Sequence, residues 1–223
     1  MGKTRRPYWL GVRGEVDTIY STQEHLNVRI LMQPSVFIRP RQTREMKRAG
    51  RYAWKIGRGL NLWVVINFEC PEGDELLPQR QFQAIRKKMR SWLEYRQGKL
   101  NLPRSPITDI RTWEHVGERY HVNWVVHVPD QMIDEFQEKL PKWIEKVMGE
   151  LKDCHVQKVY HFNGLLKYIL KGTLASHAHR FGIDPSPQGR VWGRRAVAAR
   201  CLGRAARESA VTKEEVQPLS GSS

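Results

Sequence analysis

A histidine and an asparagine alternate with apolar residues in one segment near the middle of the chain, residues 120–129 (YHVNWVVHVP). Side chains on a β-strand point to opposite faces in turn, so His121 and Asn123 would share one face. Val122 and Trp124 would share the other face and pack into a core. An imidazole next to an amide oxygen can bind a divalent metal ion.

A carboxylate can join these two ligands. If Gly117 and Glu118 form a two-residue hairpin turn, Glu114 lies directly opposite His121 on the neighbouring strand. Oxygen-rich sites with one imidazole suit Mg²⁺ or Mn²⁺ better than Zn²⁺. We therefore predict a metal site made of His121, Asn123 and Glu114. The alternative is that these are ordinary polar side chains on a solvated sheet face.

A tyrosine and a lysine three residues apart form the second feature that could carry chemistry, in residues 167–171 (KYILK). On a helix, Tyr168 and Lys171 share a face. A nearby ammonium favours the phenolate and attracts phosphate, so Tyr168 could be a nucleophile in phosphoryl transfer. The alternative is a buried tyrosine flanked by two solvated lysines.

The periodicity of the chain predicts the elements that must position these residues. Apolar, β-branched runs predict strands, and apolar stripes with helical spacing predict helices. The strands are expected at 61–69, 107–115, 120–128 and 155–162, and the helices at 79–96 and from residue 130 onward. The second helix should break or kink near Pro141.

A further short helix, capped by Asn163 and closed by Gly172, would carry Tyr168. The resulting order β-α-β-β-α-β is that of a ferredoxin-like α+β fold. We expect both long helices on one face of the sheet, and the other face open to a ligand.

The charge of the chain is unevenly distributed. Lys and Arg exceed Asp and Glu by 9 in residues 1–60 and by 7 in residues 154–223, whereas residues 61–153 have a net charge of −1. Basic arms attract polyanions, so nucleic acid is the first partner to consider. The predicted organisation is a basic N-terminal extension (1–60), a central domain (61–175), a basic helical extension (176–210, with a helix near 191–207) and a disordered tail (211–223).

Aromatic residues are interleaved with the N-terminal basic residues, at Tyr8, Trp9, Tyr52 and Trp54. This combination suits contact with a nucleic-acid backbone together with base stacking. The alternative is that these aromatics pack the extension onto the core.

Several classes of protein are disfavoured. No apolar run is long enough to span a membrane, and residues 1–6 lack the apolar core of a signal peptide, so we expect a cytoplasmic protein. The three cysteines are scattered at Cys70, Cys154 and Cys201, which argues against a disulfide scaffold and against a cysteine-rich zinc site.

An apolar strand, a hairpin strand with His-Val-Asn and a later helix with Tyr-x-x-Lys together resemble the HUH endonuclease superfamily. The nearest resemblance is to single-tyrosine replication-initiator-like proteins of bacterial phages and plasmids. In these a motif similar to HxHWLxHVP precedes a YxxKG segment. The stretch 187–195 (PQGRVWGRR) is similar to the basic tail of that group. The resemblance covers about residues 61–205.

The resemblance implies that a bacterial, cytoplasmic protein nicks and rejoins single-stranded DNA at an origin or a hairpin. This would initiate rolling-circle replication or a related mobilisation of DNA. Tyr168 would attack a metal-polarised phosphate and form a 5′-phosphotyrosyl link, while Lys171 stabilises the negative charge or helps to deprotonate the phenol. The sequence contains no GxxxxGK nucleotide-binding motif, so strand separation would need a host helicase.

One position departs from the motif. The second metal histidine of the superfamily is Asn123 here, so only His121 is carried over directly. An amide oxygen is a neutral ligand that still binds a hard cation. His127 shares the face of His121, but six residues along a strand is roughly 20 Å, too far to share an ion.

Exposed cationic side chains near these elements would hold the flanking DNA. The candidates are Lys167, Arg190, Arg194, Arg195, Arg200 and Arg204. The alternative function is a catalytically degenerate DNA- or RNA-binding protein on the same fold, which the asparagine at position 123 favours.

Overall fold

The computed structural model describes residues 33–117, 119–150 and 154–215, with side chains up to residue 210. The chain divides into two compact units, residues 1–33 and 34–223. All elements named here belong to the second unit. The segment 34–60, which we expected to be part of an N-terminal extension, therefore lies in the same unit as the sheet. Tyr8, Trp9, Glu118 and the end of the expected tail, 216–223, lie outside the described residues.

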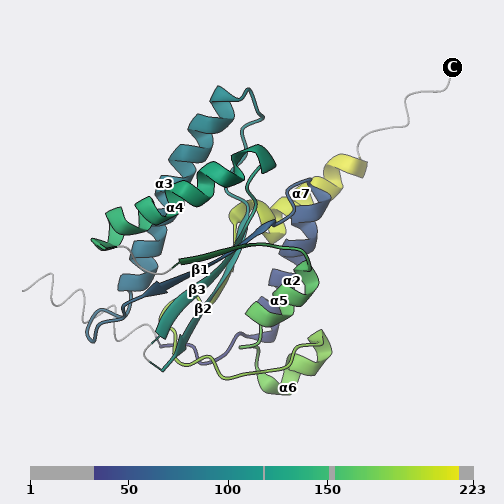
Figure 1. Ribbon diagram of the computed structural model, residues 1–223. Coiled ribbons are helices and arrows are strands. Elements are labelled where there is room, and N and C mark those ends of the chain that lie inside the picture. Colours follow the sequence, from purple (N-terminus) through teal and green to yellow (C-terminus); the bar gives the residue numbers. More distant parts are fainter. Residues whose placement is uncertain (1–32, 118, 151–153, 216–223) are drawn as a thin grey trace, which may run out of the picture. The chain divides into compact units, whose positions relative to one another are not determined.

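The expected β-α-β-β-α-β order is confirmed, and it builds an antiparallel sheet (Figure 1). The strands are β1 (Leu62–Phe68), β2 (Asp109–Val116), β3 (Arg119–Val126) and β4 (Cys154–Lys158). They lie in the order β4-β1-β3-β2, and a short strand β5 (Ala196–Ala198) extends the sheet next to β2. The fold is therefore α+β and compatible with the ferredoxin-like arrangement.

Two long helices cover one face of the sheet, as expected. They are α3 (Leu77–Lys99) and α4 (Ile133–Met148), which follows the short 3₁₀ turn η1 (Asp130–Met132). Phe82 of α3 and Phe136 of α4 both pack edge-on against Trp124 of β3. Full burial of such side chains stabilises the fold by about 1.5–3 kcal/mol each. The helix α4 continues through Pro141, where we expected a break or a kink.

The second face of the sheet is not open, which corrects our expectation. The helices α2 (Pro40–Lys55) and α5 (Phe162–Ile169) pack over it, and Figure 1 shows both on the side opposite α3 and α4. Ile110 and Val125 of the sheet are fully buried in this second core. The two helices approach closely, because a Cβ atom at Gly50 would lie only 2.4 Å from Phe162 Cζ.

The chain after α5 also differs from the expected helix at 191–207. It forms α6 (Ala175–Ala178) and the 3₁₀ turn η2 (His179–Phe181), then β5, the 3₁₀ turn η3 (Arg200–Leu202) and α7 (Arg204–Glu215). The short strand β5 pairs with β2 from Ile110 to Thr112. Strand β4 ends at Lys158, and the N-cap of α5 is His161 rather than Asn163.

Within the described residues, no helix has both the length and the apolar character needed to cross a membrane.

Candidate functional site

The site is centred on the carboxylate of Glu114, near the turn that joins β2 to β3. The strand register pairs Glu114 with His121 and Val116 with Arg119, as the predicted hairpin requires. Gly117 in the turn has a φ of 61°, a left-handed conformation that glycine adopts without strain. Glu114 Oε2 lies 3.2 Å from His121 Nε2, although the Glu114 side chain is only 3% exposed.

Asn123 contacts the same carboxylate, but through its nitrogen. Its Nδ2 atom donates to Glu114 Oε1 at 2.9 Å, and its Oδ1 atom accepts from Trp63 Nε1 at 3.1 Å. An indole N–H only donates, so Trp63 fixes the orientation of the amide. The oxygen that we expected to face a cation is therefore turned toward Trp63, which corrects the expected geometry of the ligand trio.

Lys171 connects this cluster to Tyr168. Its Nζ atom lies 3.2 Å from Glu114 Oε2 and 4.0 Å from the centre of the Tyr168 ring. The helix α5 ends at Ile169, yet the Lys171 backbone N–H donates to the Tyr168 carbonyl at 3.1 Å. This extra turn preserves the helical spacing, so the two side chains meet as the Tyr-x-x-Lys spacing predicts.

Tyr168 is on the surface and not in the hydrophobic interior. Its side chain is 48% exposed, and its ring packs edge-on against Trp63 with 5.6 Å between ring centres. Trp63 also contacts the ring of His155 on β4, at 6.3 Å. Trp63 thus supports the phenol on one side and Asn123 on the other, a role that sequence reasoning missed.

The buried carboxylate of Glu114 is well compensated. Asn123 donates to one of its oxygens, and Lys171 and His121 lie at the other. An unpaired carboxylate in this environment would be costly, so the cationic partner stabilises the arrangement. The cluster presents an ammonium and an imidazole beside an exposed phenol, which is a set of groups suited to a phosphate ligand.

Two of the three ligands expected for a divalent cation lie together here, although the Lys171 ammonium contacts the same Glu114 oxygen. Glu114 Oε2 and His121 Nε2 are 3.2 Å apart, a spacing that two neighbouring ligands of one ion can have. Asn123 does not offer its oxygen in this arrangement. In the part of the chain that the structure describes, no three His, Cys, Asp or Glu side chains gather so as to hold a metal ion.

The residues expected to contact DNA come from several different elements. Lys167 is exposed on α5 next to Tyr168, Arg190 and Arg194 are exposed before β5, and Arg200 and Arg204 are exposed in η3 and α7. Arg204 also pairs with Glu208 at 2.6 Å.

Arg195 does not fit the expected role. It is only 1% exposed, and its guanidinium donates to the carbonyl oxygens of Ser35 and Gln188. Burial is the main cause that lowers the pKa of Arg195, to about 10. This side chain connects segments of the fold instead of reaching a ligand.

Two exposed aromatic side chains form a second feature of the surface. Trp54 on α2 is 59% exposed and Tyr160 before α5 is 79% exposed, and both line a hollow of about 590 Å³ together with Arg51. Tyr52, by contrast, is half-buried and donates to the Ala206 carbonyl at 3.2 Å, which fits the packing alternative.

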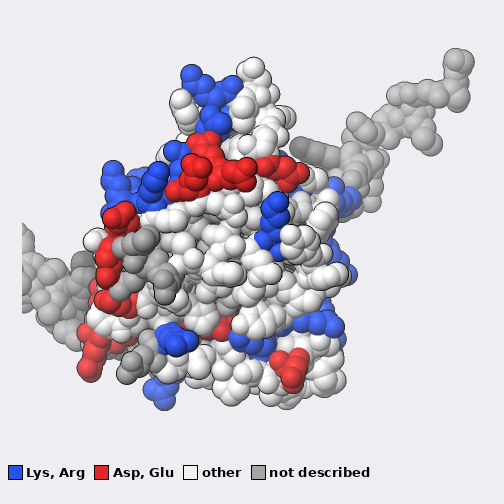
Figure 2. Space-filling view, viewed as in Figure 1, with Lys and Arg blue, Asp and Glu red and all other residues white. Residues whose placement is uncertain are grey.

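Charge is segregated on the surface (Figure 2). In this view acidic side chains gather over α4, which contains Asp134, Glu135, Glu138 and Glu145. The sequence of α2, in contrast, contains six Lys and Arg and one Glu. The sequence of α4 also contains three lysines, so its charges nearly cancel, and a polyanion would be attracted to α2, on the Tyr168 side of the sheet, more than to α4.

Comparison with known proteins identifies no relative: no family model matches the chain, and no curated protein or solved structure matches it significantly.

Proposed function

We propose that this protein cuts and rejoins single-stranded DNA, with Tyr168 as the nucleophile. The observation that carries the proposal is the position of Lys171, whose ammonium contacts both the Tyr168 ring and the Glu114 carboxylate. An exposed phenol beside a cation suits attack on a phosphodiester, because the cation attracts the phosphate and stabilises the negative charge that develops on it.

The reaction balances as a phosphoryl transfer. The phenol oxygen of Tyr168 attacks the phosphorus and loses its proton, and the bond from phosphorus to the 3′-oxygen breaks. That oxygen takes up a proton and leaves as a free 3′-hydroxyl, while the 5′-phosphate stays on the tyrosine. Lys171 stabilises the added negative charge or assists the loss of the phenol proton. The reverse reaction rejoins the strand without an added energy source.

Glu114 and His121 would hold a Mg²⁺ or Mn²⁺ ion in this proposal. Such an ion supplies Lewis-acid polarisation of the scissile phosphate when it is bound. Asn123 would become the third ligand only if its amide rotated and gave up the hydrogen bond from Trp63.

Surrounding features favour a single strand as the substrate. The exposed rings of Trp54 and Tyr160 can stack on unpaired bases, a contact worth about 1–3 kcal/mol per base. Arg51 beside them and Lys167 beside Tyr168 can contact the phosphates. An origin or a hairpin of a rolling-circle replicon would be the substrate, with a host helicase to separate the strands.

A covalent-adduct assay tests the proposal. The protein is incubated with single-stranded origin-type oligonucleotides and Mn²⁺, and protein–DNA adducts are separated under denaturing conditions. We expect an adduct that Tyr168→Phe abolishes. Tyr160→Phe is the matched control, since it removes an even more exposed phenol next to the same helix, keeps the ring and should leave the adduct unchanged. An adduct that persists in Tyr168→Phe would overturn the assignment.

The second candidate function is nucleic-acid binding without cleavage. The hydrogen bond from Trp63 to Asn123 favours it, because it withholds one ligand from a cation. Thermal unfolding with and without Mn²⁺ separates the two. A nuclease should be stabilised by the ion, and His121→Ala should remove that effect, whereas a protein that only binds should show no stabilisation in either form.

A further inference from the structure

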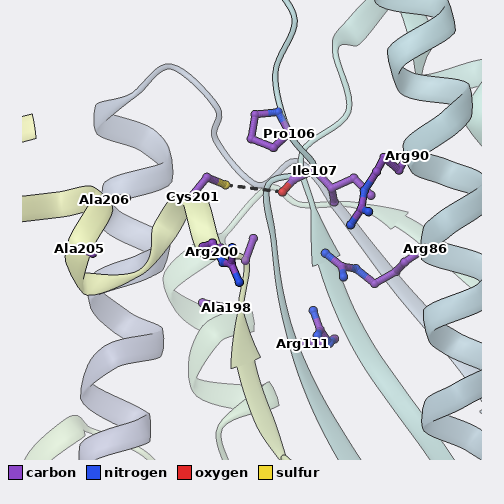
Figure 3. Close-up of a pocket in the computed structure, with 11 residues that line it drawn as sticks. Arg86, Arg90, Pro106, Ile107, Arg111, Ala198, Arg200, Cys201, Ala205 and Ala206 are labelled. Atoms are coloured by element: carbon purple, nitrogen blue, oxygen red, sulfur yellow. Dashed lines mark hydrogen bonds between the residues drawn. The ribbon is translucent and has the colours of Figure 1, made fainter. Parts of the chain in front are cut away.

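A hollow of about 720 Å³ lies near the end of the sheet where β5 is added, away from Tyr168. Arginines from three parts of the fold line it: Arg86 and Arg90 from α3, Arg111 from β2 and Arg200 from η3. Figure 3 shows their side chains extending toward a shared space between α3 and the β5–η3 segment. We call this the arginine pocket.

The inner part of the arginine pocket is rigidly held by Asp109, which is fully buried. Both Asp109 oxygens accept from Arg86, at 2.9 and 3.0 Å. Trp124 Nε1 also donates to Asp109 at 2.7 Å and fixes the carboxylate in the core. A bidentate pair of this kind holds a guanidinium in one orientation before any ligand arrives.

Arg111 is held in the same way. It is 7% exposed, donates to Asp109 at 3.4 Å and lies 5.6 Å above the ring of Phe82. Burial first, and then the positive charge of Arg86, lower the pKa of Arg111, against the opposing effect of Asp109. A bound anion would relieve this accumulation of positive charge.

The outer part of the arginine pocket has no compensating charge. Arg90 and Arg200 are exposed, and their guanidinium groups form no hydrogen bond or ion pair with the described part of the chain. Of the four guanidinium groups, only those of Arg86 and Arg111 contact Asp109, and no acidic side chain is among the described residues that line the pocket. The remaining walls are small and apolar, from Pro106, Ile107 and Ala198 among others.

We propose that the arginine pocket is a phosphate-binding site, which takes the phosphate of a nucleotide unit. Guanidinium groups bind phosphate oxygens through paired hydrogen bonds, and the apolar walls leave space for a sugar or a base. Arg111 and Glu114 point to opposite faces of β2, so the Arg111 guanidinium and the cluster around Glu114 lie on different sides of the sheet, and Tyr168 does not line the pocket. Phosphate binding here does not depend on the Tyr168 chemistry.

The test uses the full chain as Tyr168→Phe, so that no covalent adduct can form. Affinity is measured by calorimetry for pyrophosphate, for thymidine monophosphate and for a short single-stranded thymidine oligonucleotide. The variants Arg90→Glu and Arg200→Glu reverse charge at exposed positions that no packing depends on. Lys87→Glu is the matched control: an exposed residue of the same helix that does not line the pocket, with the same change in net charge. Circular dichroism verifies that each variant is folded.

Loss of one charge-assisted contact should weaken binding by at least about tenfold. We expect Arg90→Glu and Arg200→Glu to weaken pyrophosphate binding to this extent, with Lys87→Glu within about twofold of the parent. If the oligonucleotide loses affinity in parallel and pyrophosphate competes with it, the phosphate belongs to a nucleic-acid strand. If the variants lose affinity only for pyrophosphate and thymidine monophosphate, the phosphate site is supported and its ligand is a free nucleotide. Equal losses in all three variants, or no binding of pyrophosphate, would overturn the proposal.

Discussion

The ammonium of Lys171, just after α5, lies 3.2 Å from the Oε2 atom of Glu114, a residue of β2 that comes 57 positions earlier in the chain. This ion pair fixes the end of α5 to β2. The same ammonium lies 4.0 Å from the ring centre of Tyr168, so the pair also sets where the phenol lies. One contact therefore serves both the stability of the fold and the placement of the candidate nucleophile.

Lys171→Met should destabilise the fold by about 1.5–3 kcal/mol, because it removes one charged partner of the buried Glu114 carboxylate. Urea unfolding at neutral pH measures the change. Lys167→Met is the control, because Lys167 is exposed on the same helix, and its free energy of unfolding should change by less than about 0.5 kcal/mol. In the double variant Lys171→Met with Glu114→Gln much of the loss should be recovered; strictly additive effects would contradict the pairing.

Gly50→Ala should destabilise the protein by about 1–3 kcal/mol, since the added methyl would lie 2.4 Å from Phe162 Cζ and push α2 away from α5. Gly98→Ala provides the comparison. A Cβ atom there meets nothing within 4 Å, so the lower entropy of the unfolded chain should stabilise by about 0.4–1 kcal/mol. Thermal unfolding of both variants measures this, and a stabilising Gly50→Ala would show that the helices are not in close contact.

The packing of α2 explains why part of the fold could not be predicted from the sequence. The strands and the helices α3 and α4 bury large apolar side chains at regular spacing, and that periodicity predicts them. The buried face of α2 consists of Thr43, Met46, Ala49, Gly50 and Ala53. These mostly small residues give a weak apolar signal between many arginines, so the helix and the face that it covers were missed.

Part of the candidate site could also be predicted from the sequence, and part of it could not. The hairpin turn sets the pairing of Glu114 with His121, and the spacing of three brings Tyr168 to Lys171. The role of Trp63 depends on the pairing of β1 with β3, which no local pattern specifies. The burial of Arg195 was equally hidden, because the charge of an arginine predicts a surface position.

Acid should destabilise the protein in part through His127. Burial lowers the pKa of His127 below its usual 6.5, and its Nδ1 atom donates to the Gly59 carbonyl at 2.9 Å in the neutral form. The unfolded chain then binds a proton at His127 more readily than the folded chain does. The contribution of His127 to the free energy of unfolding is therefore complete above pH 6.5 and falls as the pH drops below that value. The free energy of unfolding of wild type and His127→Gln, measured from neutral pH to about pH 5, should show a smaller decline in the variant. Equal declines would contradict this assignment.

Trp63→Phe should increase the response of the protein to Mn²⁺. The change removes the N–H donor that holds the Asn123 oxygen at 3.1 Å, and the amide is then free to rotate toward Glu114 and His121. A third ligand should raise the affinity for the ion, measured as a larger Mn²⁺-induced shift in the unfolding temperature. The increase should disappear in Trp63→Phe combined with Asn123→Leu, which keeps a side chain of similar size but has no ligand atom. If the single and double variants respond equally to Mn²⁺, Asn123 is not a ligand, and Glu114 with His121 would be the whole of the proposed cation site.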